Sequence, residues 1–325
     1  MTRYLDPKND LTFKRIFGEH PHLLVSFLNA LMPLAPGRLI ESIKYLSPEQ
    51  VPDSPAKKNS IVDVKCTDNQ GRHFIVEMQM YWSDIFKSRL VFNASKAYVR
   101  QIGKSASYHL LQPVYGLGLI NDIFDHKTGE FYHHYQTINR YNTEEVIEGL
   151  EFVLIELPKF KSSEQAKFLT WPDKRRSNRT MACLWLKFLS EVEDATQTVS
   201  PELLNNSEIQ EALSLCEEGA FTEEELERYD KYWDYVRTEK GIKDLARMEG
   251  EATGRAEGKA EGRAEGRAEG RAEGEATGRS KGKAEELERI VLNAYQNKFT
   301  VEQIRAFSSL SKEDILEILK RNKNM

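Results

Sequence analysis

Cysteine is scarce in this sequence of 325 residues, which contains only Cys66, Cys183 and Cys216. The three are scattered, odd in number and never in the CxxC spacing of zinc sites and redox motifs. Small secreted domains that depend on disulfides carry many paired cysteines, so this usage favours a reducing compartment. It also argues against a structural zinc ion.

Long apolar runs are missing too. None approaches the roughly 20 residues that a transmembrane helix needs, and the N-terminal MTRYLDPKND lacks the apolar core of a signal peptide. Neither a phosphate-binding P-loop nor a dinucleotide-binding glycine motif is present, which predicts no nucleotide cofactor. We therefore expect a cytoplasmic protein without a membrane partner.

The composition is that of a globular protein with an additional charged segment, with 40% hydrophobic and 30% charged residues. The formal net charge of -5 gives the surface no general positive potential. A nucleic acid would therefore have to bind a local basic patch.

Apolar periodicity predicts an α/β domain followed by helices. Two short helices, a strand, a hairpin, a long helix and a buried strand form a core that closes near residue 160. We expect a mixed β-sheet flanked by helices over residues 1–160. A helical extension over 161–240 should pack beside or against it.

A glycine then recurs at every fourth position from Gly250 to Gly282. Each glycine inside a helix costs about 1 kcal/mol relative to alanine, and like charges fall at i, i+4 positions, where they repel. This pattern favours a charged, mobile linker over 241–283, and the alternative is a helix stabilised only by association. A small helical tail over 284–325 contains two capping-box patterns and suits docking or oligomerisation as well as DNA binding.

Two β-rich runs around the turn-forming segment Asp68–Gly71 predict a hairpin. If it is symmetric about Gln70, Asp63 faces Glu77, with Cβ atoms about 4.5–5.5 Å apart. Gln79 shares the face of Glu77 because alternate strand residues point the same way. Two adjacent carboxylates repel, but they suit Mg²⁺, which binds one or two carboxylates plus water and phosphate oxygens. The alternative is an ordinary hairpin with one exposed polar face, and a register slip of one residue would separate the pair.

Short motifs before, within and after the hairpin form an ordered set: Asp10 with Phe13-Lys14 and Phe17-Gly18, Phe27-Leu28-Asn29, Asp63-Val64, Gly71-Arg72, Ile75-Val76-Glu77-Met78-Gln79, Arg89, Tyr108 and Pro113-Val114-Tyr115. Over about residues 5–160, this set resembles the Rpn family of recombination-promoting nucleases and transposases, within the PD-(D/E)XK nuclease superfamily. The resemblance implies a restriction-endonuclease-like core and Mg²⁺-dependent DNA cleavage linked to recombination or mobile elements. It makes Asp63 and Glu77 metal ligands, with Mn²⁺ or Ca²⁺ as alternative ions.

Gln79 stands where the superfamily pattern usually has lysine. Glutamine carries no charge and cannot act as a general acid or base, but it can orient the attacking water. Lys65, on the predicted face of Asp63, is our candidate for the missing positive charge. The superfamily often adds an acidic residue from the first helix, for which Glu19 is our candidate as a third metal ligand. Asp10 is better explained as a helix cap.

Basic side chains follow on the helix after the hairpin. Lys96, Arg100 and Lys104 fall at i, i+4 and i+8, and Lys87 and Arg89 lie upstream. We expect Arg89, Lys96, Arg100 and Lys104 to contact DNA phosphates, which would give affinity without sequence specificity. A solvated helix face is the alternative.

Two other functions stay open. One is a catalytically weak, transposase-derived DNA-binding protein, for which Gln79 is the main argument. The other is an interaction protein that forms homo-oligomers through the helical half and the C-terminal tail.

Overall fold

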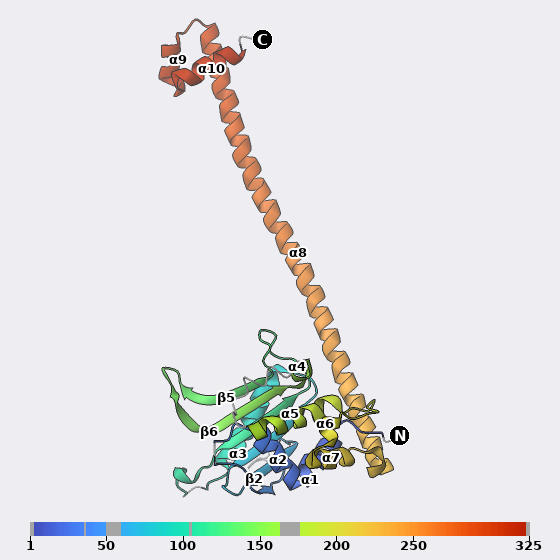
Figure 1. Cartoon of the computed structure of the whole chain (residues 1–325). Coiled ribbons are helices and arrows are strands. Elements are labelled where there is room, and N and C mark those ends of the chain that lie inside the picture. Colours follow the sequence, from blue (N-terminus) through green and yellow to red (C-terminus); the bar gives the residue numbers. More distant parts are fainter. Residues whose placement is uncertain (1–2, 36, 50–59, 104–105, 163–175, 323–325) are drawn as a thin grey trace. The chain divides into compact units, whose positions relative to one another are not determined.

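The structure is a computed structural model that describes residues 3–35, 37–49, 60–103, 106–162 and 176–322 (Figure 1). The chain divides into two compact units, Met1–Gly241 and Ile242–Met325. The helical extension expected over 161–240 therefore belongs to the same unit as the α/β core. Buried residues of its helices and of the sheet form one hydrophobic core.

The first unit contains, within the described residues, a six-stranded mixed sheet in the order β1-β2-β3-β4-β6-β5. Strands β3, β4 and β6 are parallel neighbours, and the other pairs are antiparallel. The predicted α/β class with a mixed sheet flanked by helices is confirmed. The strands are β1 (Ile43–Tyr45), β2 (Val64–Asp68), β3 (His73–Gln79), β4 (Val114–Ile120), β5 (Tyr132–Asn139) and β6 (Asn142–Glu156).

Helices cover both faces of the sheet (Figure 1). One face packs against α3, and the other packs against α1, α2 and α5. Trp185 of α5 lies against Phe17 and Phe27, with ring centroids 5.4 and 5.6 Å away, so the extension completes the main core. The helices of this unit are α1 (Asp10–Glu19), α2 (Pro21–Leu31), α3 (Asp84–Val99), α4 (Leu157–Ser162), α5 (Arg176–Glu191), α6 (Pro201–Leu204), α7 (Ser207–Leu215) and the start of α8 (Glu223–Gln296), with short 3-10 turns at Tyr108–Leu110 and Glu218–Ala220.

Strands β2 and β3 form the predicted hairpin in the predicted register. Val64 pairs with Val76, and Lys65 pairs with Ile75. The turn uses Gly71 at φ +80°, a conformation that favours glycine. Continuing this register by one residue places Asp63, just before β2, opposite Glu77.

Helix α3 lies close to the sheet because β4 contributes glycines beneath it. A Cβ atom at Gly118 would lie 2.7 Å from Leu154 Cδ2 and 3.0 Å from Phe86 Cε1. Such contacts are shorter than packed side chains tolerate, so only glycine allows this approach. The close approach brings the polar side chains of α3 over the end of β3.

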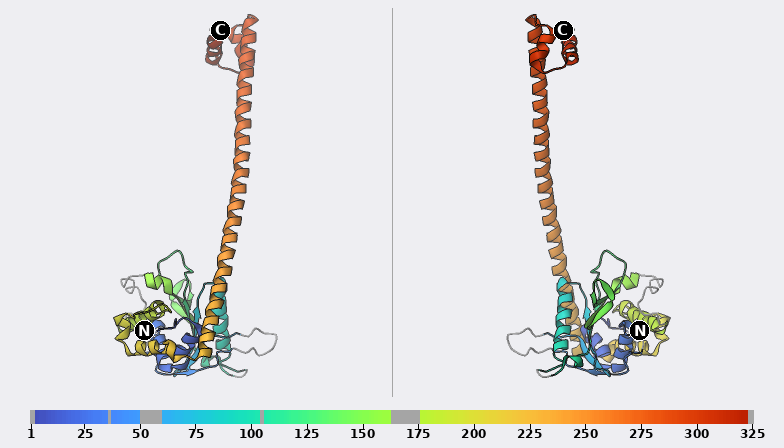
Figure 2. Two further views of the ribbon diagram at one scale, coloured as in Figure 1. Left: turned by 90° about the vertical axis from the view of Figure 1, so that its right-hand side faces the viewer. Right: turned by 90° about the vertical axis from the view of Figure 1, so that its left-hand side faces the viewer.

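The second unit contains most of α8, then α9 (Val301–Ser308) and α10 (Lys312–Asn322). Helix α8 is continuous through the glycine repeat, so the mobile linker expected there is wrong and the segment is helical (Figure 2). Alanine, glutamate and arginine between the glycines are strong helix formers, and Arg255 pairs with Glu251 one turn away at 3.2 Å. None of the described helices combines the length and apolarity needed to cross a bilayer.

The predicted caps of the tail are confirmed. The Thr300 hydroxyl accepts a hydrogen bond from the Gln303 backbone N–H, and Gln303 completes the capping box. Ser311 and Asp314 form the matching contact before α10. The helices enclose a small core of Val291, Ile304, Ile315 and Leu319.

Candidate active site

Polar side chains gather where β3 ends, beside the start of β2. In open α/β sheets, ligands bind outside the carboxyl ends of the strands. Glu77 and Gln79 lie in the last three residues of β3. Asp63 directly precedes β2, which is antiparallel to β3. This edge therefore has both the location and the side chains of a catalytic site.

Asp63 is fixed by the backbone of the neighbouring strand. Its Oδ2 accepts a hydrogen bond of 2.7 Å from the Met78 N–H. Burial raises the pKa of Asp63, and the Asp10 carboxylate raises it further against the opposing effects of Met78, Lys14 and Arg89. The carboxyl group thus lies in a poorly solvated place that still favours a cation nearby.

Glu77 is only 4% exposed, so the alternative of an exposed polar face is wrong at this position. The physical reason is α3, which covers it: Asn93 Nδ2 donates a 3.0 Å hydrogen bond to Glu77 Oε1. Arg89 Nη2 lies 3.7 Å from Oε2. Burial raises the pKa of Glu77, and the neighbouring Asp63 carboxylate raises it further.

Gln79 is held at both ends of its amide. Its Oε1 accepts a 2.6 Å hydrogen bond from Arg89 Nη2, and its Nε2 donates a 2.9 Å bond to the Tyr81 carbonyl. The Arg89 side chain is 46% exposed, so its guanidinium faces solvent beside both carboxyl groups. A positive charge from α3 thus lies directly beside Gln79 and Glu77 of β3.

The cations that lower the pKa of the two carboxyls are Lys14 and Arg89, whereas Lys65 lies two residues along the chain from Asp63. Lys65 pairs with Ile75, two residues along β3 from Glu77. Burial lowers the pKa of Lys65, and the nearby Arg100 and Lys96 lower it further. Lys65 therefore belongs to a group of cations with Lys96 and Arg100, farther along α3.

Glu19 is placed away from the carboxylates. It is the last residue of α1, nine residues after Asp10, or about 14 Å along the helix axis. Its charge acts on Tyr45, where burial raises the pKa of the hydroxyl above its ordinary range and Glu19 adds to that effect. Lys104, the last of the expected phosphate contacts, lies outside the described residues.

Asp10 is the acidic residue of the first helix that lies near Asp63. The expectation of a helix cap is wrong, because Asn9 caps α1 by accepting from the Leu11 N–H at 2.9 Å. Asp10 forms an ion pair of 2.7 Å with Lys14 one turn later. Their i, i+4 spacing is visible in the sequence, but only the packing of α1 shows that both act on Asp63.

Two further residues, which no sequence motif indicates, lie near the carboxylates. Asn93 lies one turn after Arg89 on α3, a spacing that puts both on one face. Tyr232 comes from the start of α8, and burial together with the Asp63 and Asp10 charges raises the pKa of its hydroxyl. Nothing in the local sequence around Tyr232 indicates this proximity, which depends on how the helical extension packs.

The donor set fits a hard divalent cation. Among the described residues, no group of three or more histidine, cysteine, aspartate or glutamate side chains is placed to hold a metal ion by itself. Asp63 and Glu77 supply two carboxylates, which matches the preference of Mg²⁺ for few protein ligands plus water and phosphate oxygens. A cation between them would also offset the burial that raises both pKa values and the Asp63 charge that further raises the pKa of Glu77.

A family model described as PD-(D/E)XK nuclease family transposase matches residues 7–245. The match includes the whole sheet, α1 to α7 and the first part of α8, so it extends beyond the α/β core into the helical extension. No curated protein and no solved structure matches the chain.

The carboxylate pair predicts a pH-dependent stability of the metal-free protein. Both carboxyls have a raised pKa when folded, so the native state keeps protons that the unfolded chain releases. The free energy of unfolding should therefore fall by about 1–3 kcal/mol between about pH 5 and pH 9. Urea unfolding with a chelator present measures this. Glu77→Gln should remove most of this decrease in the free energy of unfolding. The control Glu144→Gln, at an exposed position, should leave the decrease unchanged. Equal pH profiles for wild type and Glu77→Gln would contradict the assignment of the decrease to the carboxylate pair.

Proposed function

Since the chain belongs to the PD-(D/E)XK nuclease family transposases, we propose that it is a metal-dependent DNA endonuclease that hydrolyses phosphodiester bonds. The observation that carries the proposal is the pair of Asp63 and Glu77 on one hairpin, with the Arg89 guanidinium beside them. Asp63 and Glu77 are the proposed ligands of Mg²⁺, with Mn²⁺ or Ca²⁺ as alternatives. The proposed setting is recombination or mobile-element activity in the cytoplasm, in keeping with three free cysteines.

The chemistry that a divalent cation supplies in such a site is polarisation of the phosphoryl oxygen and activation of water near neutral pH. The chain itself contributes orientation. The Met78 N–H and the Asn93 amide hold the two carboxylates, so little rearrangement is needed when substrate binds. In this proposal the Gln79 amide orients a water molecule by hydrogen bonds, and it does not act as a general acid or base.

Arg89 is the proposed replacement for the usual lysine. Its side chain carries a permanent charge, contacts Gln79 and Glu77, and remains accessible to a phosphate. In this role it stabilises the negative charge that develops on the phosphoryl oxygens during hydrolysis. Lys65 and Glu19 are not needed in this proposal.

DNA is proposed to run along α3 through contacts with its phosphates. Arg89 contacts the phosphate at the site, and Lys96 and Arg100 contact phosphates farther along the helix, with Lys104 as a further candidate. Such contacts position a duplex without reading its bases, which accounts for the low sequence specificity that we propose.

Cleavage of supercoiled plasmid tests the proposal. Purified protein should nick or linearise the plasmid with Mg²⁺ or Mn²⁺ and should be inactive with a chelator. Asp63→Asn and Glu77→Gln should each lower the rate at least ~100-fold because a metal ligand is lost. Glu144→Gln serves as a matched surface control. A lack of cleavage with every metal, or cleavage that survives both substitutions, would refute the nuclease function and favour the DNA-binding alternative.

The role of the Arg89 charge can be tested by moving the positive charge from position 89 to position 79. Arg89→Ala should reduce cleavage by about 10–100-fold without abolishing metal binding, because the lost cation acts on the phosphate. Gln79→Lys alone should also impair cleavage, since it puts a second cation against Arg89. The double variant Gln79→Lys/Arg89→Ala has the usual lysine and should be more active than either single variant. A double variant with the product of both defects would contradict this assignment.

The last part of the proposal is that copies of this chain form homo-oligomers through the second unit. Phe299, Phe307 and Leu316 are exposed large apolar side chains of that unit, at 47%, 53% and 39%. Light scattering should give the full chain a mass of two or more protomers, and truncation after Gly241, the unit boundary, should give a monomer. A monomeric full chain would exclude this interface.

A further inference from the structure

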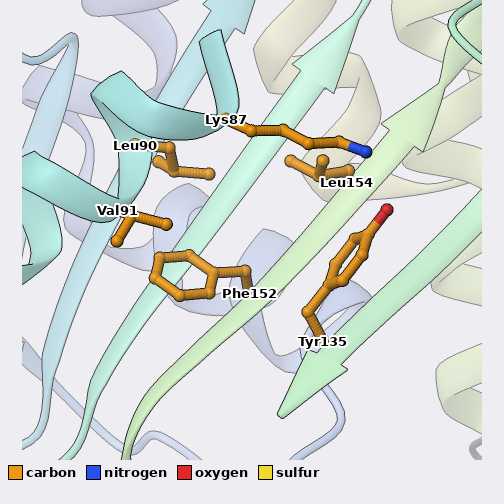
Figure 3. Close-up of a pocket in the computed structure, with 6 residues that line it drawn as sticks. All are labelled: Lys87, Leu90, Val91, Tyr135, Phe152 and Leu154. Carbon is orange, nitrogen blue, oxygen red and sulfur yellow. The ribbon is translucent and has the colours of Figure 1, made fainter. Parts of the chain in front are cut away.

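A pocket lies between α3 and the β5–β6 hairpin, away from the carboxylates. It is lined by Lys87, Leu90, Val91, Tyr135, Phe152 and Leu154 (Figure 3). Its volume of ≈ 130 Å³ suits one small flat group better than a drug-sized molecule. The surface that lines it is apolar, and the Lys87 ammonium and the Tyr135 hydroxyl are the polar ends of two lining side chains.

The two aromatic side chains that line the pocket come from the paired strands β5 and β6. Tyr135 of β5 is the direct cross-strand partner of Phe152 of β6, so the two side chains share one face of the sheet. The register shifts directly after Tyr135, and such bulges often redirect side chains near functional sites. Gly116 of β4 allows Phe152 to lie over it, since a Cβ there would be 2.8 Å from the Phe152 ring.

Lys87 lies among aromatic ring faces. Its Nζ is 4.8 Å from the Phe124 ring centroid, 5.3 Å from that of Tyr135 and 5.4 Å from that of Trp82. Trp82 and Phe124 stack at 4.4 Å. Among these rings Tyr135 is exposed, at 38%. An accessible aromatic ring next to a cation suits single-stranded nucleic acid, in which bases stack and phosphates pair with the positive charge.

The pocket lies within reach of the proposed cleavage site. Glu77, Gly118 and Leu154 are successive partners across β3, β4 and β6. With strands about 4.8 Å apart, Glu77 and Leu154 are about 10 Å apart through the sheet. Phe86 of α3 packs over Gly118 between them, so a bound strand would pass around the first turns of α3 to reach both sites. Lys87 and Arg89 lie two residues apart on α3, so they point to different flanks of its first half, one toward each site.

We propose that this pocket holds an unpaired nucleobase of the DNA substrate, stacked on Tyr135, with Lys87 at the adjoining phosphate. The inference rests on the proposed nuclease function and specifies its substrate class as DNA with unpaired nucleotides near the cut. Charge complementarity selects this occupant: the apolar lining with its aromatic rings suits a base, and the adjoining Lys87 ammonium suits a phosphate, whereas an apolar peptide would supply no anion for it.

The experiment uses the full chain and a single-stranded oligonucleotide containing 2-aminopurine, whose fluorescence is quenched by stacking. A chelator prevents cleavage during the measurement. Wild type and Tyr135→Phe, which keeps the ring, should quench the probe. Tyr135→Leu keeps apolar bulk but removes the ring, and it should lose the quenching and bind about tenfold more weakly. Tyr141→Leu is the matched control, because Tyr141 is 97% exposed on the same hairpin and does not line the pocket.

Lys87→Gln should retain quenching but show weaker salt dependence of binding, since one phosphate contact is lost. Quenching by Tyr135→Leu equal to wild type, or no quenching by wild type, would overturn the proposal and leave a protein partner for the pocket. Failure of the nuclease function is distinguishable: Asp63→Asn should still quench the probe. A wild type that quenches normally but cleaves no DNA would refute only the nuclease activity.

Discussion

Asp63 and Glu77 must be held together against their mutual repulsion, and much of the first unit serves that purpose. Their repulsion grows because both lie where water is largely excluded, which raises the pKa of each group. The opposing interactions are few and specific: the Met78 N–H, the Asn93 amide and the charges of Lys14 and Arg89. Without a cation the two ionised carboxylates destabilise each other, and a bound cation would offset this repulsion.

Helix α3 connects this constraint to the rest of the fold. Glycines in β4 let the helix lie directly on the sheet, and its successive turns then serve different purposes. Arg89 and Asn93 face the carboxylates, Phe86 and Leu90 fill the core, and Lys87 lies at the aromatic pocket. The proposed nuclease site and the proposed base-binding pocket both depend on α3. Because α3 is one continuous helix, it keeps the distance between the two sites constant.

The helical extension is part of the same folded unit. Trp185 of α5 completes the main core, and the start of α8 brings Tyr232 near Asp63. The family match through residue 245 follows this physical boundary rather than the end of the sheet. The glycine repeat beyond it is helical, and every glycine from Gly250 to Gly282 has open space around it within this chain. Glycine lowers helix propensity, whereas the alanine, glutamate and arginine between the glycines raise it.

Local patterns in the sequence determined the α/β class, the hairpin and its register, because turn residues and strand alternation act over a few positions. They also determined the family resemblance and the caps of the tail. Only the tertiary structure decided which charged groups meet: Asp10 instead of Glu19, and Arg89 instead of Lys65, approach the carboxylates. Such encounters depend on how α1 and α3 pack on the sheet, and packing geometry is set by contacts between residues far apart in the chain. For the same reason, neither Tyr232 near Asp63 nor the pocket between α3 and β5–β6 could be read from spacing along one element.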